Sequence, residues 1–155
     1  MIKKTVVLIL IATMFLSSCK VQSSVTLHPT ATSMPFCNRS DVEKAANEFN
    51  ELIIYFVRVN EKVTKGDLSD LDKTMSEVLL IREKVNKVIV PRCLKDSQSY
   101  LIKGLDYYYE GLKNVKMKSS DWYISEKFEL ATEQFDKFND ELLKEIGRAS
   151  CRERV

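Results

Sequence analysis

Between Ser40 and Glu145, apolar residues recur every three or four positions, the spacing that gathers them on one face of an α-helix. Three breaks divide this stretch into four segments: Gly66, the Pro91–Cys93 turn and the polar run Ser119–Asp121. The expected inward positions are Val42, Ala45, Phe49, Leu52, Phe56, Val59 and Val63; Leu71, Met75, Val78, Ile81, Val85 and Val88; Leu94, Leu101, Leu105, Tyr108, Leu112 and Val115; and Ile124, Phe128, Ala131, Phe135, Phe138 and Leu142.

The helix boundaries follow from local signals. Ser40–Glu43 matches a capping box and predicts the first helix start. Asp67 or Ser69 is expected to start the second helix, and Pro91 to stop it. Because the turns are short and no strand-like alternation is present, we expect an all-α fold. The expected architecture is an antiparallel up-down-up-down four-helix bundle over residues 38–145, behind a signal peptide and a flexible tether.

The N-terminus has the features of an export signal. Lys3 and Lys4 precede an apolar run, Val6–Phe15, that is too short to span a bilayer. The following Leu16-Ser17-Ser18-Cys19 resembles the lipobox of bacterial lipoproteins. The resemblance implies a signal peptide over residues 1–18, cleaved before Cys19, whose thiol carries a diacylglyceryl group and acyl chains such as palmitate. The alternative is an ordinary secretory signal that ends in cysteine.

The same resemblance gives a location, the cell envelope, with lipid on Cys19 as the membrane attachment and the protein facing the periplasm or exterior. Lys20 differs from the aspartate that retains lipoproteins at the inner membrane of two-membrane bacteria, and inner and outer membrane both stay open. Residues 19–37 form the lipidated cysteine and a Ser/Thr-rich flexible tether, in which the single His28 has no partner for metal binding or catalysis.

The last ten residues, 146–155, resemble a translated sequencing adapter and are expected to be a non-native tail that follows the end of the fourth helix. The alternative is a genuine basic tail with a reactive thiol at Cys151. The chain carries 24 basic and 22 acidic side chains, of which the tail holds three arginines and one glutamate. Without the tail and the leader lysines, the remainder is slightly acidic, so no nucleic-acid partner is expected.

Cys37 and Cys93 are predicted to form a disulfide. In an up-down bundle, the start of the first helix and the turn between the second and third helices lie at the same end. With Cys19 acylated and Cys151 discounted, these are the two remaining thiols of an exported chain. A redox or metal-binding pair is the alternative, which the lack of a CxxC motif and of a nearby histidine disfavours.

Small residues repeat every seven positions in the third helix, at Ser97, Gly104 and Gly111. The fourth helix has large residues at the same interval, and antiparallel packing predicts the pairs Gly111–Phe128, Gly104–Phe135 and Ser97–Leu142. Close packing is the preferred interpretation. The alternative is that the small residues line a ligand cavity.

Tyr107, Tyr108 and Tyr109 fan around the third helix, so they cannot all be buried. Tyr108 is expected in the core, and Tyr107 or Tyr109 partly exposed. Trp122 and Tyr123 lie near the next turn. We prefer packing for this aromatic group, and an exposed binding surface is the alternative.

No catalytic, nucleotide-binding or metal motif occurs in the chain, and no cofactor is expected. The sequence favours a non-enzymatic envelope lipoprotein that acts in protein interaction, scaffolding or sensing. The alternative is a binder of a small apolar or aromatic ligand between the third and fourth helices. The candidate ligand or partner surface is Gly104, Tyr107, Tyr108, Gly111 and Trp122.

Overall fold

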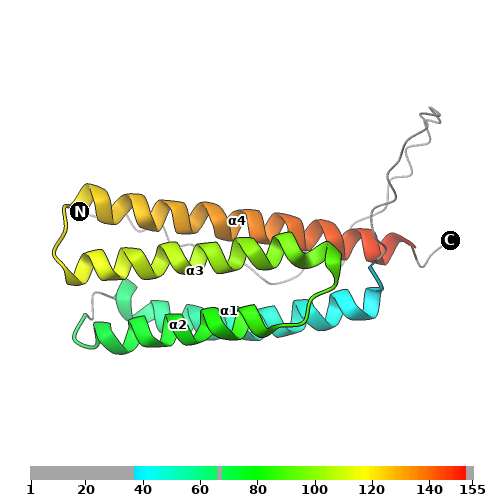
Figure 1. Ribbon diagram of the computed structural model, residues 1–155, viewed down its shortest axis with the longest axis horizontal. Coiled ribbons are helices and arrows are strands. Elements are labelled where there is room, and N and C mark those ends of the chain that lie inside the picture. The colour runs from blue at the N-terminus through cyan, green and yellow to red at the C-terminus, as the bar shows by residue number, and fades with distance from the viewer. Residues whose placement is uncertain (1–36, 66–67, 153–155) are drawn as a thin grey trace. The chain divides into compact units, whose positions relative to one another are not determined.

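The computed structural model describes residues 37–65 and 68–152, with side chains as far as residue 149. This part of the chain is all-α and contains no strand, which confirms the predicted fold class. The elements are α1 (Arg39–Thr64), α2 (Leu71–Lys87), the short 3-10 helix η1 (Arg92–Leu94), α3 (Lys95–Lys116) and α4 (Asp121–Arg152). Figure 1 shows the four α-helices side by side, with the α3–α4 turn and the start of α1 at opposite ends of the helices.

The main helix contacts are those of α3 with α4 and α2, and of α1 with α2 and α4. The α3–α4 contact is the most extensive of these. Aromatic rings join α1, α3 and α4 at the centre, where Phe56 contacts both Tyr108 and Phe135 at centroid distances of 4.9 and 5.4 Å. One apolar core therefore holds the helical bundle together.

The prediction that Ser40 caps the first helix is wrong. Asn38 is the N-cap, and its side-chain oxygen accepts a hydrogen bond from the Ser40 backbone N–H at 3.1 Å. Ser40 itself is already helical. The second helix also begins later than expected, at Leu71, and the side chain of its N-cap residue Asp70 makes no capping hydrogen bond. Gly66, the expected helix end, lies outside the described residues, and α1 has already ended at Thr64.

The turn from α3 to α4 is a Schellman motif. The Lys118 N–H bonds to the Val115 carbonyl, and the Ser119 N–H bonds to the Asn114 carbonyl at 3.0 Å. Lys118 occupies the position that usually holds glycine and has a φ of 53°. Helix α4 then begins at Asp121, at the predicted polar break.

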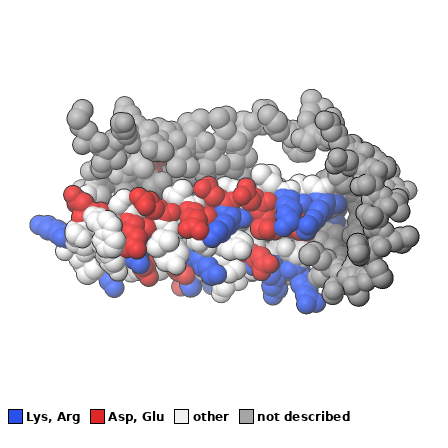
Figure 2. Space-filling model, turned by 90° about the horizontal axis from the view of Figure 1, so that it is seen from above, with Lys and Arg blue, Asp and Glu red and all other residues white. Residues whose placement is uncertain are grey.

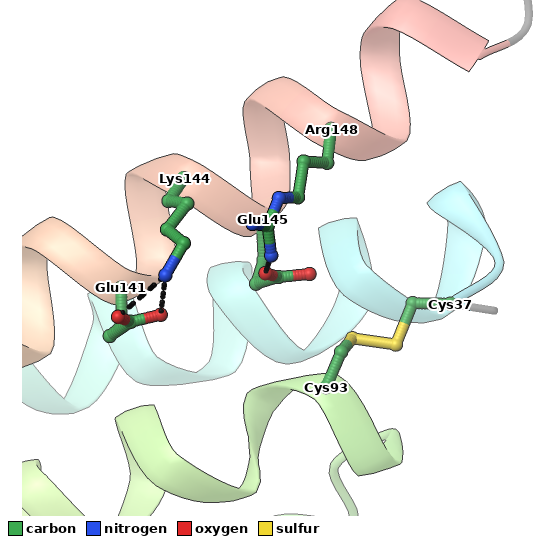
Figure 3. Close-up of polar contacts among 6 residues, drawn as sticks. All are labelled: Cys37, Cys93, Glu141, Lys144, Glu145 and Arg148. Carbon is green, nitrogen blue, oxygen red and sulfur yellow. Dashed lines mark hydrogen bonds and ion pairs between the residues drawn. A yellow bond between two sulfur atoms is a disulfide. The ribbon is translucent and has the colours of Figure 1, made fainter. Parts of the chain in front are cut away.

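The fourth helix does not stop at Glu145, so that expectation is wrong. It continues to Arg152, and Ile146 and Ala149 pack against the core. Arg148 pairs with Glu145 within this last part of the helix, near the disulfide (Figure 3). The cause is the spacing, since Ile146 and Ala149 continue the inward stripe by steps of four and three residues. That residues 146–155 are non-native stays a prediction.

Candidate functional site at the α3–α4 turn

A disulfide joins Cys37, just before α1, to Cys93 in η1, as predicted (Figure 3). The two Cα atoms are 6.2 Å apart, within the range that a disulfide bridges. The bond ties the entry of the chain into the domain to the connection between α2 and α3. Cys19 and the tether, including His28, lie outside the described residues.

The two glycines of α3 pack as expected against phenylalanines of α4. An ideal Cβ on Gly104 would lie 2.6 Å from Cδ1 of Phe135, and one on Gly111 would lie 2.9 Å from Cζ of Phe128. The pairs run in opposite directions along the two helices, which confirms the predicted register for these two pairs. Because the rings occupy the space beside the glycines, these two positions line a packed contact and not a cavity.

Ser97, the third small residue, is fully buried, and its hydroxyl has no hydrogen-bond partner among the residues that the structure describes. A buried hydroxyl without a partner is unfavourable, since it has lost its water. Ser97 therefore supplies a small volume to the core and no polar contact within the described chain.

The three consecutive tyrosines divide as predicted. Tyr108 is 6% exposed, its hydroxyl donates to Oδ1 of Asn60 on α1, and burial raises its pKa. Tyr107 and Tyr109 are half-buried. Tyr108 is thus a core residue that connects two helices and does not belong to an exposed surface.

The expectation that the remaining aromatics pack is wrong for Trp122. Its side chain is 73% exposed, and Met117 and Tyr123 beside the same turn are 57% and 40% exposed. The rings of Trp122 and Tyr123 are 6.3 Å apart. Trp122 is the second residue of α4 and points away from the core-facing stripe. We call Met117, Trp122 and Tyr123 the aromatic tip.

Next to the aromatic tip, Lys127 bridges the two helices. Its Nζ is 3.1 Å from Oε2 of Glu110 and lies over the rings of Tyr107 and Tyr123, at 5.7 and 5.3 Å from the centroids. The hydrogen bond to Glu110 raises the pKa of Lys127. These cation–π contacts place the Lys127 ammonium between Tyr123 of α4 and Tyr107 of α3. Lys127 was not predicted as part of this surface, although it lies four residues after Tyr123 in the sequence.

An open pocket of about 390 Å³ adjoins the aromatic tip and is lined by Glu110, Lys113, Asn114, Met117, Ser119 and Tyr123. Glu110, Lys113 and Asn114 lie at positions i, i+3 and i+4 of α3, and Met117 is the residue that caps its end. Asn114 is only 6% exposed. The structure thus brings Trp122 and this unpredicted pocket together, and leaves Gly104, Gly111 and Tyr108 in the packed interior.

The described residues contain no group of three His, Cys, Asp or Glu side chains that could hold a metal ion. None of the described helices combines the length and apolar character needed to cross a membrane. The face of the domain drawn in Figure 2 mixes acidic and basic side chains and shows no continuous basic surface. No protein-family model, curated protein or solved structure matches the chain.

Proposed function

We propose that the protein is a non-enzymatic, lipid-anchored lipoprotein of the bacterial cell envelope that binds a protein partner through the aromatic tip. In this proposal the domain is an antiparallel up-down-up-down four-helix bundle behind a cleaved signal peptide. Lipid on Cys19 holds it to a membrane, facing the periplasm or exterior. The lipobox-like Leu16–Cys19 supports the anchor.

The exposed side chain of Trp122 is the observation that supports binding of a protein partner. A tryptophan side chain presents a large apolar area, and aromatic residues that are buried on binding dominate the energy of many interfaces. Here the 73% exposed ring stands next to two further exposed apolar side chains, so the surface is a patch and not a single residue.

The aromatic tip and the point where the chain enters the domain lie at opposite ends of the helices. The tether reaches the domain at Cys37, and the α3–α4 turn lies at the other end of the helices (Figure 1). In this proposal, Trp122 lies at the end of the domain opposite to the one where the chain from Cys19 enters.

The anchor is tested by replacing Cys19. A Cys19→Ala variant is expected to lose incorporation of radiolabelled palmitate and to leave the membrane fraction. The matched control is Cys151→Ala, which is expected to keep both. If Cys19→Ala retains the label and the membrane location, the lipoprotein assignment is wrong.

The interaction surface is tested by photo-crosslinking in the source cells. A benzophenone amino acid at position 122 is expected to give a discrete adduct with one protein. The same amino acid at Asp136, an exposed position farther along α4, serves as the control and is expected to give none. Absence of an adduct at position 122, or the same adducts at both positions, would contradict the proposal.

A further inference from the structure

The pocket beside the aromatic tip is lined by a largely buried asparagine, Asn114. Asn114 is 6% exposed, and its side chain lines the pocket. Its amide makes no hydrogen bond within the described part of the chain, while its backbone carbonyl is used by Ser119. The amide atoms are open to the pocket, where water or a ligand can form hydrogen bonds with them. A ligand that both donates and accepts hydrogen bonds would satisfy this amide.

The other walls of the pocket define the chemistry of that ligand. Lys113 has no ion-pair partner among the described residues, and the Ser119 hydroxyl adds a neutral donor and acceptor. The carboxylate of Glu110 is already bound by Lys127. Tyr123 and Met117 add apolar surface. The pocket therefore offers one cation, neutral polar groups and an aromatic ring, and its one carboxylate is occupied.

We propose that this pocket binds a saccharide unit. Sugar hydroxyls donate and accept at once, as the Asn114 amide requires, and the C–H face of a sugar ring packs on an aromatic side chain such as Tyr123. Lys113 can donate to a hydroxyl, or to a carboxylate in a sugar acid. A free amino acid or peptide terminus fits less well, since its ammonium group would need the carboxylate that Lys127 holds.

The size of the pocket agrees with this ligand class. A volume of about 390 Å³ lies near the lower end of the range for small-molecule sites. One or two sugar rings suit such a volume, and the open side of the pocket leaves room for a longer glycan to continue. The saccharide site is independent of the lipid anchor, and shares only Met117 and Tyr123 with the proposed protein-binding surface.

Saturation-transfer NMR tests the proposal on the full-length protein, held in a zwitterionic detergent that contains no sugar. The probes are N,N′-diacetylchitobiose and maltose, with dialanine as the zwitterionic comparison. We expect saturable transfer to the ring protons of at least one sugar, and none to dialanine. Asn114→Ala is expected to weaken sugar binding about tenfold, the effect of losing hydrogen bonds to one buried amide.

Asn50→Ala on α1 is the matched control, a half-buried amide outside the pocket, and is expected to bind sugar like the parent. Because Asn114 makes no internal side-chain hydrogen bond, its alanine variant is expected to keep the melting temperature. Should the Asn114 variant unfold, Tyr123→Ala gives a second measurement of the loss of sugar binding.

The proposal is overturned if neither sugar binds, if dialanine binds equally well, or if the pocket variants that fold bind like the parent. Cys19→Ala is expected to bind sugar normally, so failure of the lipoprotein proposal would leave this result unaffected.

Discussion

The packing of glycines against phenylalanines predicts that alanine is harmful at Gly104, although alanine favours a helix. Carbon atoms in contact are normally about 3.5–4.0 Å apart. The added Cβ would lie 2.6 Å from Cδ1 of Phe135, a ring that Phe56 also contacts at 5.4 Å. The ring must therefore move within the core. At Gly111 the nearest ring atoms are 2.9 Å away, so a smaller shift is needed.

The two opposing energies can be compared. Replacing a glycine in a helix by alanine gains about 1 kcal/mol from backbone preference. Overpacking a core costs about 1–3 kcal/mol. We therefore expect Gly104→Ala to destabilise the domain by up to about 2 kcal/mol and Gly111→Ala to be closer to neutral. Gly147 is the matched control: it is helical, nothing lies within 4 Å of its added Cβ, and Gly147→Ala should gain the full preference.

Urea and thermal unfolding with the disulfide intact measure these differences. A change of 1 kcal/mol shifts the melting temperature by about 4 °C in a domain of this size. The expected order of stability is Gly147→Ala, then Gly111→Ala, then Gly104→Ala. Combining Gly104→Ala with Phe135→Leu should recover part of the loss, because the smaller side chain makes room. If Gly104→Ala is as stable as Gly147→Ala, the packing argument is refuted.

Three further changes test single features of the fold. Replacing Cys37 and Cys93 together by serine should lower stability by about 4 kcal/mol in denaturant unfolding, the chain-entropy value for residues 56 apart, and an unchanged midpoint would show that the bond contributes nothing. Ser97→Ala should raise the melting temperature by the equivalent of about 1 kcal/mol, because it removes a buried hydroxyl without a partner; a lower temperature would mean that the hydroxyl is paired. Lys118→Gly should stabilise by about 1 kcal/mol, since glycine adopts the φ of 53° without strain, and Lys118→Ala, which keeps the strain, should not.

The sequence was sufficient for features that depend on regular spacing. The 3–4 periodicity gave the core, as Phe49, Leu105 and Phe138 illustrate, and the seven-residue repeat of Gly104 and Gly111 gave their partners in α4. These features are predictable because a helix repeats its geometry at every turn.

Features were harder to predict where two nearby residues could serve as the helix cap, or where burial depends on a neighbouring helix. Asn38 and Ser40 are both good caps, and the structure uses Asn38, the residue next to the disulfide-bonded Cys37. The exposure of Trp122 depends on which neighbouring helix covers the start of α4, which hydrophobicity alone does not tell. The burial of Asn114 had no signal in the sequence, because it lies outside the apolar stripe of α3 and depends on the turn that follows the helix.

The last turns of α4 allow the inward stripe to be tested where the sequence resembles an adapter. Ile146 packs against the core, whereas Leu143, three residues earlier on the same helix, is 66% exposed. Both are aliphatic, so Leu143→Ala is a matched control for Ile146→Ala. We expect the Ile146 variant to lose about 1 kcal/mol, less than for a fully buried site because the residue is only partly covered, and the Leu143 variant to change by less than about 0.5 kcal/mol. Equal effects in urea unfolding would mean that Ile146 stabilises the core no more than the exposed Leu143 does, and that the inward stripe of α4 ends before Ile146.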